Sequence, residues 1–100
     1  MMPEVGFNDL PAADKQKWSK AVTHTSAALF ATPSKYEPWK HGIPCSYIFC
    51  NLDNALPMPY QQGMAAQLTA KDTKTATLET GHCPFLSKPQ ELLLALESVL

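Results

Sequence analysis

The sequence lacks the features that mark membrane, secreted and nucleic-acid-binding proteins. Its apolar stretches fall far short of the ~20 residues needed to cross a bilayer. The segment from Met1 to Glu4 has neither the basic region nor the apolar region of a signal peptide. No basic residues cluster and the formal net charge is −1, so we expect neither nucleic acid nor membrane as a partner. These absences together predict a cytoplasmic protein.

Paired cysteines are also missing. The three cysteines, Cys45, Cys50 and Cys83, are an odd number without C-x-x-C spacing, so we expect reduced thiols. A zinc site made of these thiols and His82 would lack the closely spaced ligand pairs that zinc sites use. We therefore expect no metal ion and no cofactor.

The sequence does contain enough apolar residues for one small domain. Of its 100 residues 45% are hydrophobic and 17% are charged, which argues against disorder. The order of the expected elements is helices, strand, helix, strand, loop and helix, which is typical of an α/β fold. In the helix that begins near Pro59, the recurrence of Tyr60, Met64 and Leu68 predicts a buried stripe. The expected helices cover residues 11–22, 26–31, 59–68 and 89–100, and the expected strands cover residues 46–50 and 75–79.

Two polar residues follow the two expected strands. The apolar run 47–50 leads to Asp53, and His82 follows the second strand directly after Gly81. Reacting groups of open α/β sheets lie at the carboxyl ends of strands, so we expect Asp53 and His82 side by side there. An Asp that orients a His forms two members of a nucleophile–base–acid triad. Each residue alone also fits a plainer interpretation, Asp53 as a turn cap and His82 as a surface histidine.

Other residues allow weaker functional interpretations. A Cys83 nucleophile beside His82 ranks last, because adjacent residues rarely converge on one reacting atom. The remaining histidines, His24 and His41, are expected on the surface. The aromatic side chains of the first half have no basic residues alternating with them, so we expect packing residues or the lining of an acyl pocket. These aromatic residues are Trp18, Phe30, Tyr36 and Trp39.

Two short motifs taken together resemble one family. The first is C-x-x-D-x-x-x-P, with Cys50, Asp53 and Pro57, and the second is G-H-x-P-F-L-S-x-P, which begins at Gly81 and His82. This pattern is similar to the C-terminal part of α/β-hydrolase fold proteins, in the branch of methylesterases and hydroxynitrile lyases. The resemblance implies that Asp53 is the catalytic acid and His82 the catalytic base of a triad acting on carboxylic esters or similar small molecules. It implies the last two parallel strands of that fold with their flanking helices.

The resemblance also assigns two regions, and it has a gap. Residues 1–42 are similar to the end of the family's helical cap, and residues 43–100 to its C-terminal core segment. The family's nucleophile is a Ser in G-x-S-x-G, and this sequence contains no such motif. We therefore expect a hydrolase fragment that holds the acid and base but not the nucleophile or the oxyanion hole. The alternative is a non-catalytic interaction module that uses an exposed strand edge and the Leu-rich last helix.

Overall fold

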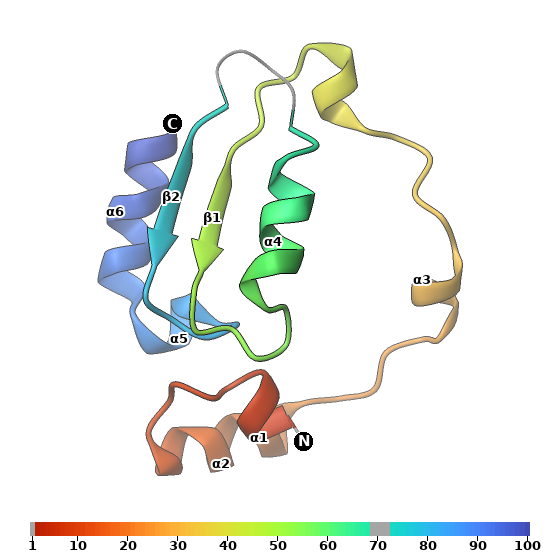
Figure 1. The fold of residues 1–100 in the computed structure, drawn as a ribbon. Helices are drawn as coiled ribbons and strands as arrows, with labels where there is room; N and C mark the ends of the chain where they lie inside the picture. The colour runs from red at the N-terminus through yellow and green to blue at the C-terminus, as the bar shows by residue number, and fades with distance from the viewer. Residues whose placement is uncertain (1, 69–72) are drawn as a thin grey trace.

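Two parallel strands form the centre of the molecule. The structure is a computed structural model, and it describes residues 2–68 and 73–100. Strand β1 (Tyr47–Cys50) pairs in parallel with β2 (Thr75–Leu78), in register from the first residue to the last (Figure 1). Both strands are rich in β-branched, aromatic and other apolar residues, which suits a pleated surface. The two predicted strands are thus confirmed.

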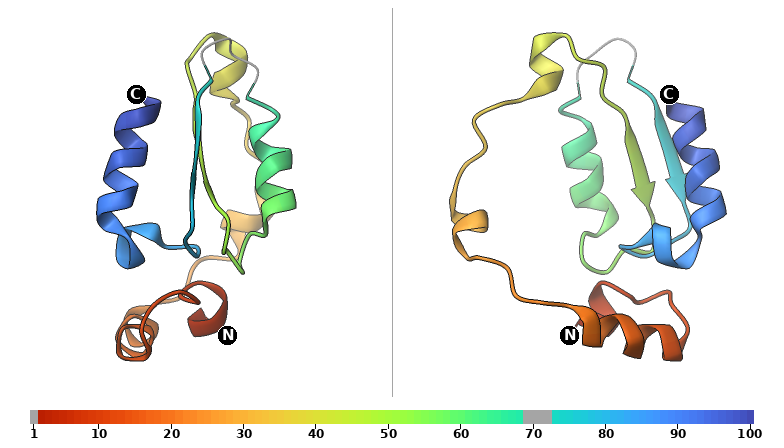
Figure 2. Two further views of the ribbon diagram at one scale, coloured as in Figure 1. Left: turned by 60° about the vertical axis from the view of Figure 1, so that its left-hand side comes forward. Right: turned by 180° about the vertical axis from the view of Figure 1, so that it is seen from behind.

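Helices lie on both faces of this small sheet. Helix α4 (Met58–Ala65) covers one face and α6 (Pro89–Val99) covers the other, as the edge-on view in Figure 2 shows. Pro59 and Pro89 lie in the first turns of these helices, where the missing N–H of proline has no intrahelical partner to lose. The resulting helix–sheet–helix order confirms the predicted α/β class, with two parallel strands.

The N-terminal segment lies across the carboxyl ends of the strands. It contains α1 (Met2–Val5) and α2 (Ala12–Ala21), which Figure 1 shows beneath the strand ends and beside the short helix α5 (Pro84–Ser87). Helix α2 confirms the first expected helix. Phe7 and Leu10, in the connection between α1 and α2, are buried. The packing of these two side chains anchors the segment, because burying apolar surface is the main force available to it.

The chain then runs in a long arc away from the sheet. The arc spans residues 22–37, contains only the one-turn helix α3 (Ala28–Ala31), and ends at the 3₁₀ turn η1 (Pro38–His41) (Figures 1 and 2). The second expected helix is therefore shorter than predicted. Phe30, which is 82% exposed, and Tyr36 contradict the prediction that the early aromatic side chains pack inside. Both lie on the arc, where Tyr36 stacks on the His41 ring, whereas the two tryptophans are half-buried.

The buried core is small for a chain of this length. The radius of gyration is 15.2 Å, against about 13 Å for a typical 100-residue domain. Within the part of the chain that the structure describes, the buried apolar side chains are Phe7, Leu10, Leu78, Pro84 and Ala95. So little burial means that the elements present do not cover one another's apolar faces.

Helix α4 shows that the predicted buried stripe is wrong. Tyr60 and Met64 are exposed, and Leu68, beyond the end of the helix, is only half-buried. The residue that α4 turns towards β1 is Gln61, which is 2% exposed and hydrogen-bonded to the backbone of Cys50. Specific polar bonding, which a hydrophobic pattern does not register, therefore sets the rotation of this helix.

The last helix carries an uncovered apolar face. On α6 only Ala95 is buried, while Leu94 is 65% exposed and Leu93 and Leu96 are exposed as well. All four residues of β1 are half-buried. This confirms the expectation that both elements show more apolar surface than a finished domain. Among residues 2–68 and 73–100, no helix is long and apolar enough to cross a membrane.

Candidate functional site

The loop after β1 holds Asp53 at the carboxyl ends of the strands. Backbone pairing between the two segments continues past the ends of β1 and β2: the Leu52 N–H donates to the Thr80 carbonyl oxygen at 2.9 Å. Asp53 then turns inward, and its Oδ1 accepts the N–H groups of Ala55 at 2.8 Å and Leu56 at 2.9 Å. The side chain is 5% exposed. These donors offset the cost of burying a carboxylate, and they leave Oδ2 available to another partner.

His82 is that partner. Its Nδ1 lies 2.8 Å from Asp53 Oδ2, and its ring is 45% exposed. An ionised carboxylate can only accept hydrogen bonds, so the contact requires a proton on Nδ1. In the neutral ring Nε2 is then without a proton. The two residues named from the sequence are thus brought together by the ends of two neighbouring parallel strands.

The N-terminal segment fixes the loop that carries His82. The Gly81 N–H donates to Asp9 Oδ2 at 2.8 Å, and Asn8 Nδ2 donates to the Leu52 carbonyl oxygen at 2.6 Å. A Cβ atom at Gly81 would lie 2.7 Å from Asp9 Oδ1 and closer still to Asn8 Oδ1, so only glycine fits there without rearrangement. Asn8 and Asp9 therefore tie the strand ends to the segment below them.

Sequence reasoning did not identify these contacts. The expected helices and strands begin only at residue 11, and none of the sequence motifs includes Gln61. One available signal was Gly81, since a glycine directly before a loop histidine can mark a close approach of another segment. No comparable signal in the sequence pointed to Gln61.

Cys83 lies next to His82 but does not resemble an activated thiol. Burial raises its pKa above the ordinary value of 9.0, and the nearby carboxylates of Asp53 and Asp9 raise it further. A nucleophilic cysteine needs the opposite shift, because the thiolate is the reactive form. The structure therefore gives no support to a Cys83 nucleophile. All three cysteines are free.

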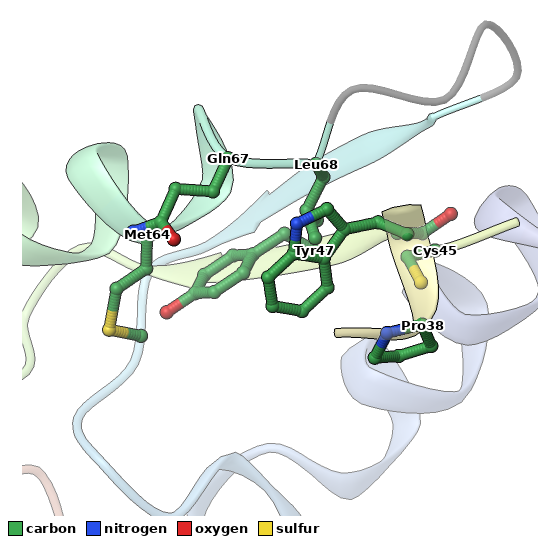
Figure 3. Close-up of a pocket in the computed structure, with 8 residues that line it drawn as sticks. Pro38, Cys45, Tyr47, Met64, Gln67 and Leu68 are labelled. Atoms are coloured by element: carbon green, nitrogen blue, oxygen red, sulfur yellow. The ribbon is translucent and has the colours of Figure 1, made fainter. Parts of the chain in front are cut away.

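Two apolar cavities lie near these elements. One, of about 340 Å³, touches the site through Cys83 and is lined by Phe7, Trp18, Ala21, Val22, Cys83, Phe85 and Leu86. The other, of about 390 Å³, lies near the start of β1, where Tyr47 extends between Met64 and Pro38 (Figure 3). Only the first adjoins the Asp53–His82 pair. In the described ranges, no group of three or more His, Cys, Asp and Glu side chains could hold a metal ion.

Comparison with known proteins gives the family. The chain is 33% identical over 84 residues to a curated protein of Phoma sp. described as a probable hydrolase, an alignment that covers 75% of this chain. It spans only about a third of that relative, since the alignment covers 34% of the relative's length. No solved structure matches the chain. The sequence profile described as the alpha/beta hydrolase family matches residues 1–96, and the chain therefore belongs to the alpha/beta hydrolase family.

Proposed function

We propose that this chain supplies the acid and the base of a serine-type triad in a hydrolase that acts on carboxylic esters or similar small molecules. The observation that carries the proposal is the 2.8 Å contact between Asp53 Oδ2 and His82 Nδ1. The carboxylate is buried and held by backbone N–H groups, while the imidazole is partly open to solvent. A fixed acid beside an accessible base is the arrangement that general-base catalysis needs.

In this proposal Asp53 fixes the ring orientation and His82 moves the proton. With Nδ1–H directed at Asp53, the bare Nε2 accepts the proton of the nucleophilic hydroxyl and later returns a proton to the leaving group. Asp53 stabilises the imidazolium that forms between these steps. Because these 100 residues contain no G-x-S-x-G, we propose that the serine and the oxyanion hole come from a segment outside them.

The finer assignments belong to the same proposal. The two motifs around Asp53 and His82 support placement in the branch of methylesterases and hydroxynitrile lyases. We assign residues 1–42 to the end of a helical cap and residues 43–100 to the C-terminal core segment. The apolar cavity beside Cys83 is suited to the apolar part of a small ester, the partner we expect for the whole protein.

Ester hydrolysis by a complete protein tests this function. The chain, fused to a relative's segment that carries G-x-S-x-G, should hydrolyse p-nitrophenyl acetate. His82→Ala should abolish turnover, while His24→Ala, which changes an exposed histidine of the arc, should leave it unchanged. Equal activity of the fusion and its His82→Ala variant would contradict the proposal.

A second candidate function has one observation in its favour. The exposed leucines of α6 would suit an interaction module that binds a protein partner through this apolar face. An in-frame upstream G-x-S-x-G segment in the same gene would favour the hydrolase, because α6 would then be covered by the rest of its own fold. A gene without such a segment would favour the interaction module.

A further inference from the structure

A buried glutamine closes the loop that carries Asp53. Gln61 is 2% exposed and lies in the first turns of α4. Its Oε1 accepts the Cys50 N–H at 2.9 Å, and its Nε2 donates to the carbonyl oxygens of Cys50 at 2.8 Å and Leu56 at 2.7 Å. Both donor hydrogens of the carboxamide are used, so the group fits its surroundings as a donor and as an acceptor.

The three partners allow only one orientation of this carboxamide. A flipped amide would set Nε2 against the Cys50 N–H and Oε1 against two carbonyl oxygens, which leaves every contact repulsive. The same three hydrogen bonds exclude other amino acids of similar size at this position. Glutamate lacks the donors, methionine lacks all three bonds, and asparagine is one methylene group too short to reach them. The site therefore requires a glutamine.

The hydrogen bonds of Gln61 join the two ends of the loop that carries Asp53, at Cys50 and Leu56. The N–H groups of Tyr47 and Asn51 face the β2 side of β1, where they donate to Lys74 and Leu78. Because successive residues of a strand alternate in direction, the peptide groups of Cys50 point to the opposite edge. There Gln61 takes both of them, as a neighbouring strand would.

Leu56 connects the Gln61 carboxamide to the Asp53–His82 pair. Its carbonyl oxygen accepts from Gln61 Nε2, and its N–H donates to Asp53 Oδ1 at 2.9 Å. The other oxygen of Asp53 is the partner of His82. One residue thus separates the Gln61 carboxamide from the carboxylate that orients the imidazole.

We propose that Gln61 is a positioning residue that holds Asp53 in the orientation that selects the Nδ1–H tautomer of His82. Its side chain is buried and bonds to backbone groups of Cys50 and Leu56, so it acts through the loop that runs between them. The catalytic meaning of this role rests on the proposed function, but the structural role is measurable without any activity.

The tautomer of His82 is the direct readout. In the ¹⁵N-labelled chain, with the imidazole neutral, long-range ¹H–¹⁵N spectra should show the Nδ1–H form of His82. Gln61→Met should shift this ring towards the Nε2–H form, because Asp53 loses its fixed position. Gln62→Met, which changes an exposed glutamine of the same helix, should leave the wild-type tautomer. A folded Gln61→Met chain that keeps the wild-type tautomer would overturn the proposal.

A second measurement needs no variant and keeps the proposal open to contradiction if Gln61→Met fails to fold. In the wild-type chain the Nε2 protons of Gln61 should exchange with solvent on the order of 100-fold more slowly than those of Gln62, and together with the amides of Ala55 and Leu56. Exchange at Gln61 as fast as at Gln62 would overturn the proposal.

The two proposals fail in different ways. In an active complete enzyme, Gln61→Met should lower kcat more than it changes KM, while Gln62→Met changes neither. If no ester is hydrolysed but the tautomer shifts as expected, the proposed function fails and the positioning role stands. If ester hydrolysis depends on His82 but Gln61→Met leaves kcat and tautomer intact, the positioning role fails alone.

Discussion

Asp53 has no freedom to rotate in this site, because each of its oxygens has a separate task. Oδ1 accepts two backbone N–H groups and Oδ2 accepts from His82. Hydrogen bonds of this kind keep a buried carboxylate in place. If one partner is removed, the groups that were bonded to it stay desolvated without a hydrogen bond, which is unfavourable. The acid is therefore part of the folded structure of the loop as well as of the proposed chemistry.

Asp53→Ala should consequently destabilise the chain. The N–H groups of Ala55 and Leu56 lose their acceptor, and we expect a loss of about 1–3 kcal/mol in the free energy of unfolding. Urea denaturation followed by circular dichroism measures it. Glu97→Ala, at an exposed position of α6, serves as the control and should change stability by less than about 0.5 kcal/mol. Equal effects would mean that the two backbone bonds contribute nothing.

Gly81 offers a matched pair of glycine substitutions. Gly81→Ala should destabilise the chain by about 1–3 kcal/mol, because its Cβ would meet the carboxylate of Asp9 and the amide of Asn8. Gly63→Ala, whose new Cβ would have no atom within 4 Å beyond its chain neighbours and its own helix backbone, should stabilise α4 by about 0.5–1 kcal/mol. Chemical denaturation of both variants checks the sign of each change. A neutral Gly81→Ala would show that the N-terminal segment does not press on this loop.

Cys83 gives a prediction about pH. In a chain whose other cysteines are changed to serine, alkylation by iodoacetamide should reach half its maximal rate above pH 9.0, because burial and two carboxylates raise the pKa of this thiol. In urea the midpoint should fall to the ordinary value. The unfolded chain then loses the proton at lower pH than the folded one, so Cys83 lowers stability as pH rises through this range. Identical midpoints in both states would contradict the raised pKa.

The residues of the site divide by how far the sequence could predict them. Asp53 and His82 could be predicted because each follows an expected strand, and the ends of parallel strands meet at one edge. Their 2.8 Å contact follows from that rule, while their catalytic role stays a prediction. The roles of Asn8, Asp9 and Gln61 could not be predicted, because these side chains bind backbone groups of other segments. Such bonds depend on the final packing and leave no periodic pattern in the sequence.

At the level of helices and strands, the sequence patterns predicted the presence and range of an element better than the face that it buries. Both strands, the first helix and the last helix lie close to their expected ranges. The predicted buried face of α4 was wrong, because the recurrence of Tyr60 and Met64 does not indicate the hydrogen bonds that Gln61 makes to Cys50. The helix of the arc, α3, covers residues 28–31 of the expected range 26–31, since a short helix without a packing partner is only marginally stable.

Helix α6 allows a test of its two faces. Leu94 is exposed and Ala95 is buried, although the two are adjacent. Leu94→Gln should change the free energy of unfolding of the chain by less than about 0.5 kcal/mol. Ala95→Leu should cost about 1–3 kcal/mol by overpacking the contact with the sheet. Denaturation curves of the two variants decide it. A costly Leu94→Gln would mean that this apolar face is covered in solution.

At the level of the whole molecule, the fold leaves the proposed chemistry incomplete. The strands present Asp53 and His82 together, and the N-terminal segment and Gln61 brace the loops that carry them. The apolar faces of β1 and α6 are only partly covered. Both observations agree with the proposal that a segment outside these residues supplies the nucleophile, because a base needs a hydroxyl to activate and a sheet face needs cover.

The isolated 100-residue chain should accordingly show no esterase turnover above background. His82 and Asp53 can accept a proton, but these residues include no G-x-S-x-G serine for them to activate. Loss of a single oxyanion-hole donor already costs roughly 10²–10³ in rate. The measurement is p-nitrophenyl acetate hydrolysis by the purified chain, with Cys83→Ser as the control. Turnover that disappears in Cys83→Ser would contradict this account and make the thiol the nucleophile, despite a raised pKa that keeps it protonated at neutral pH.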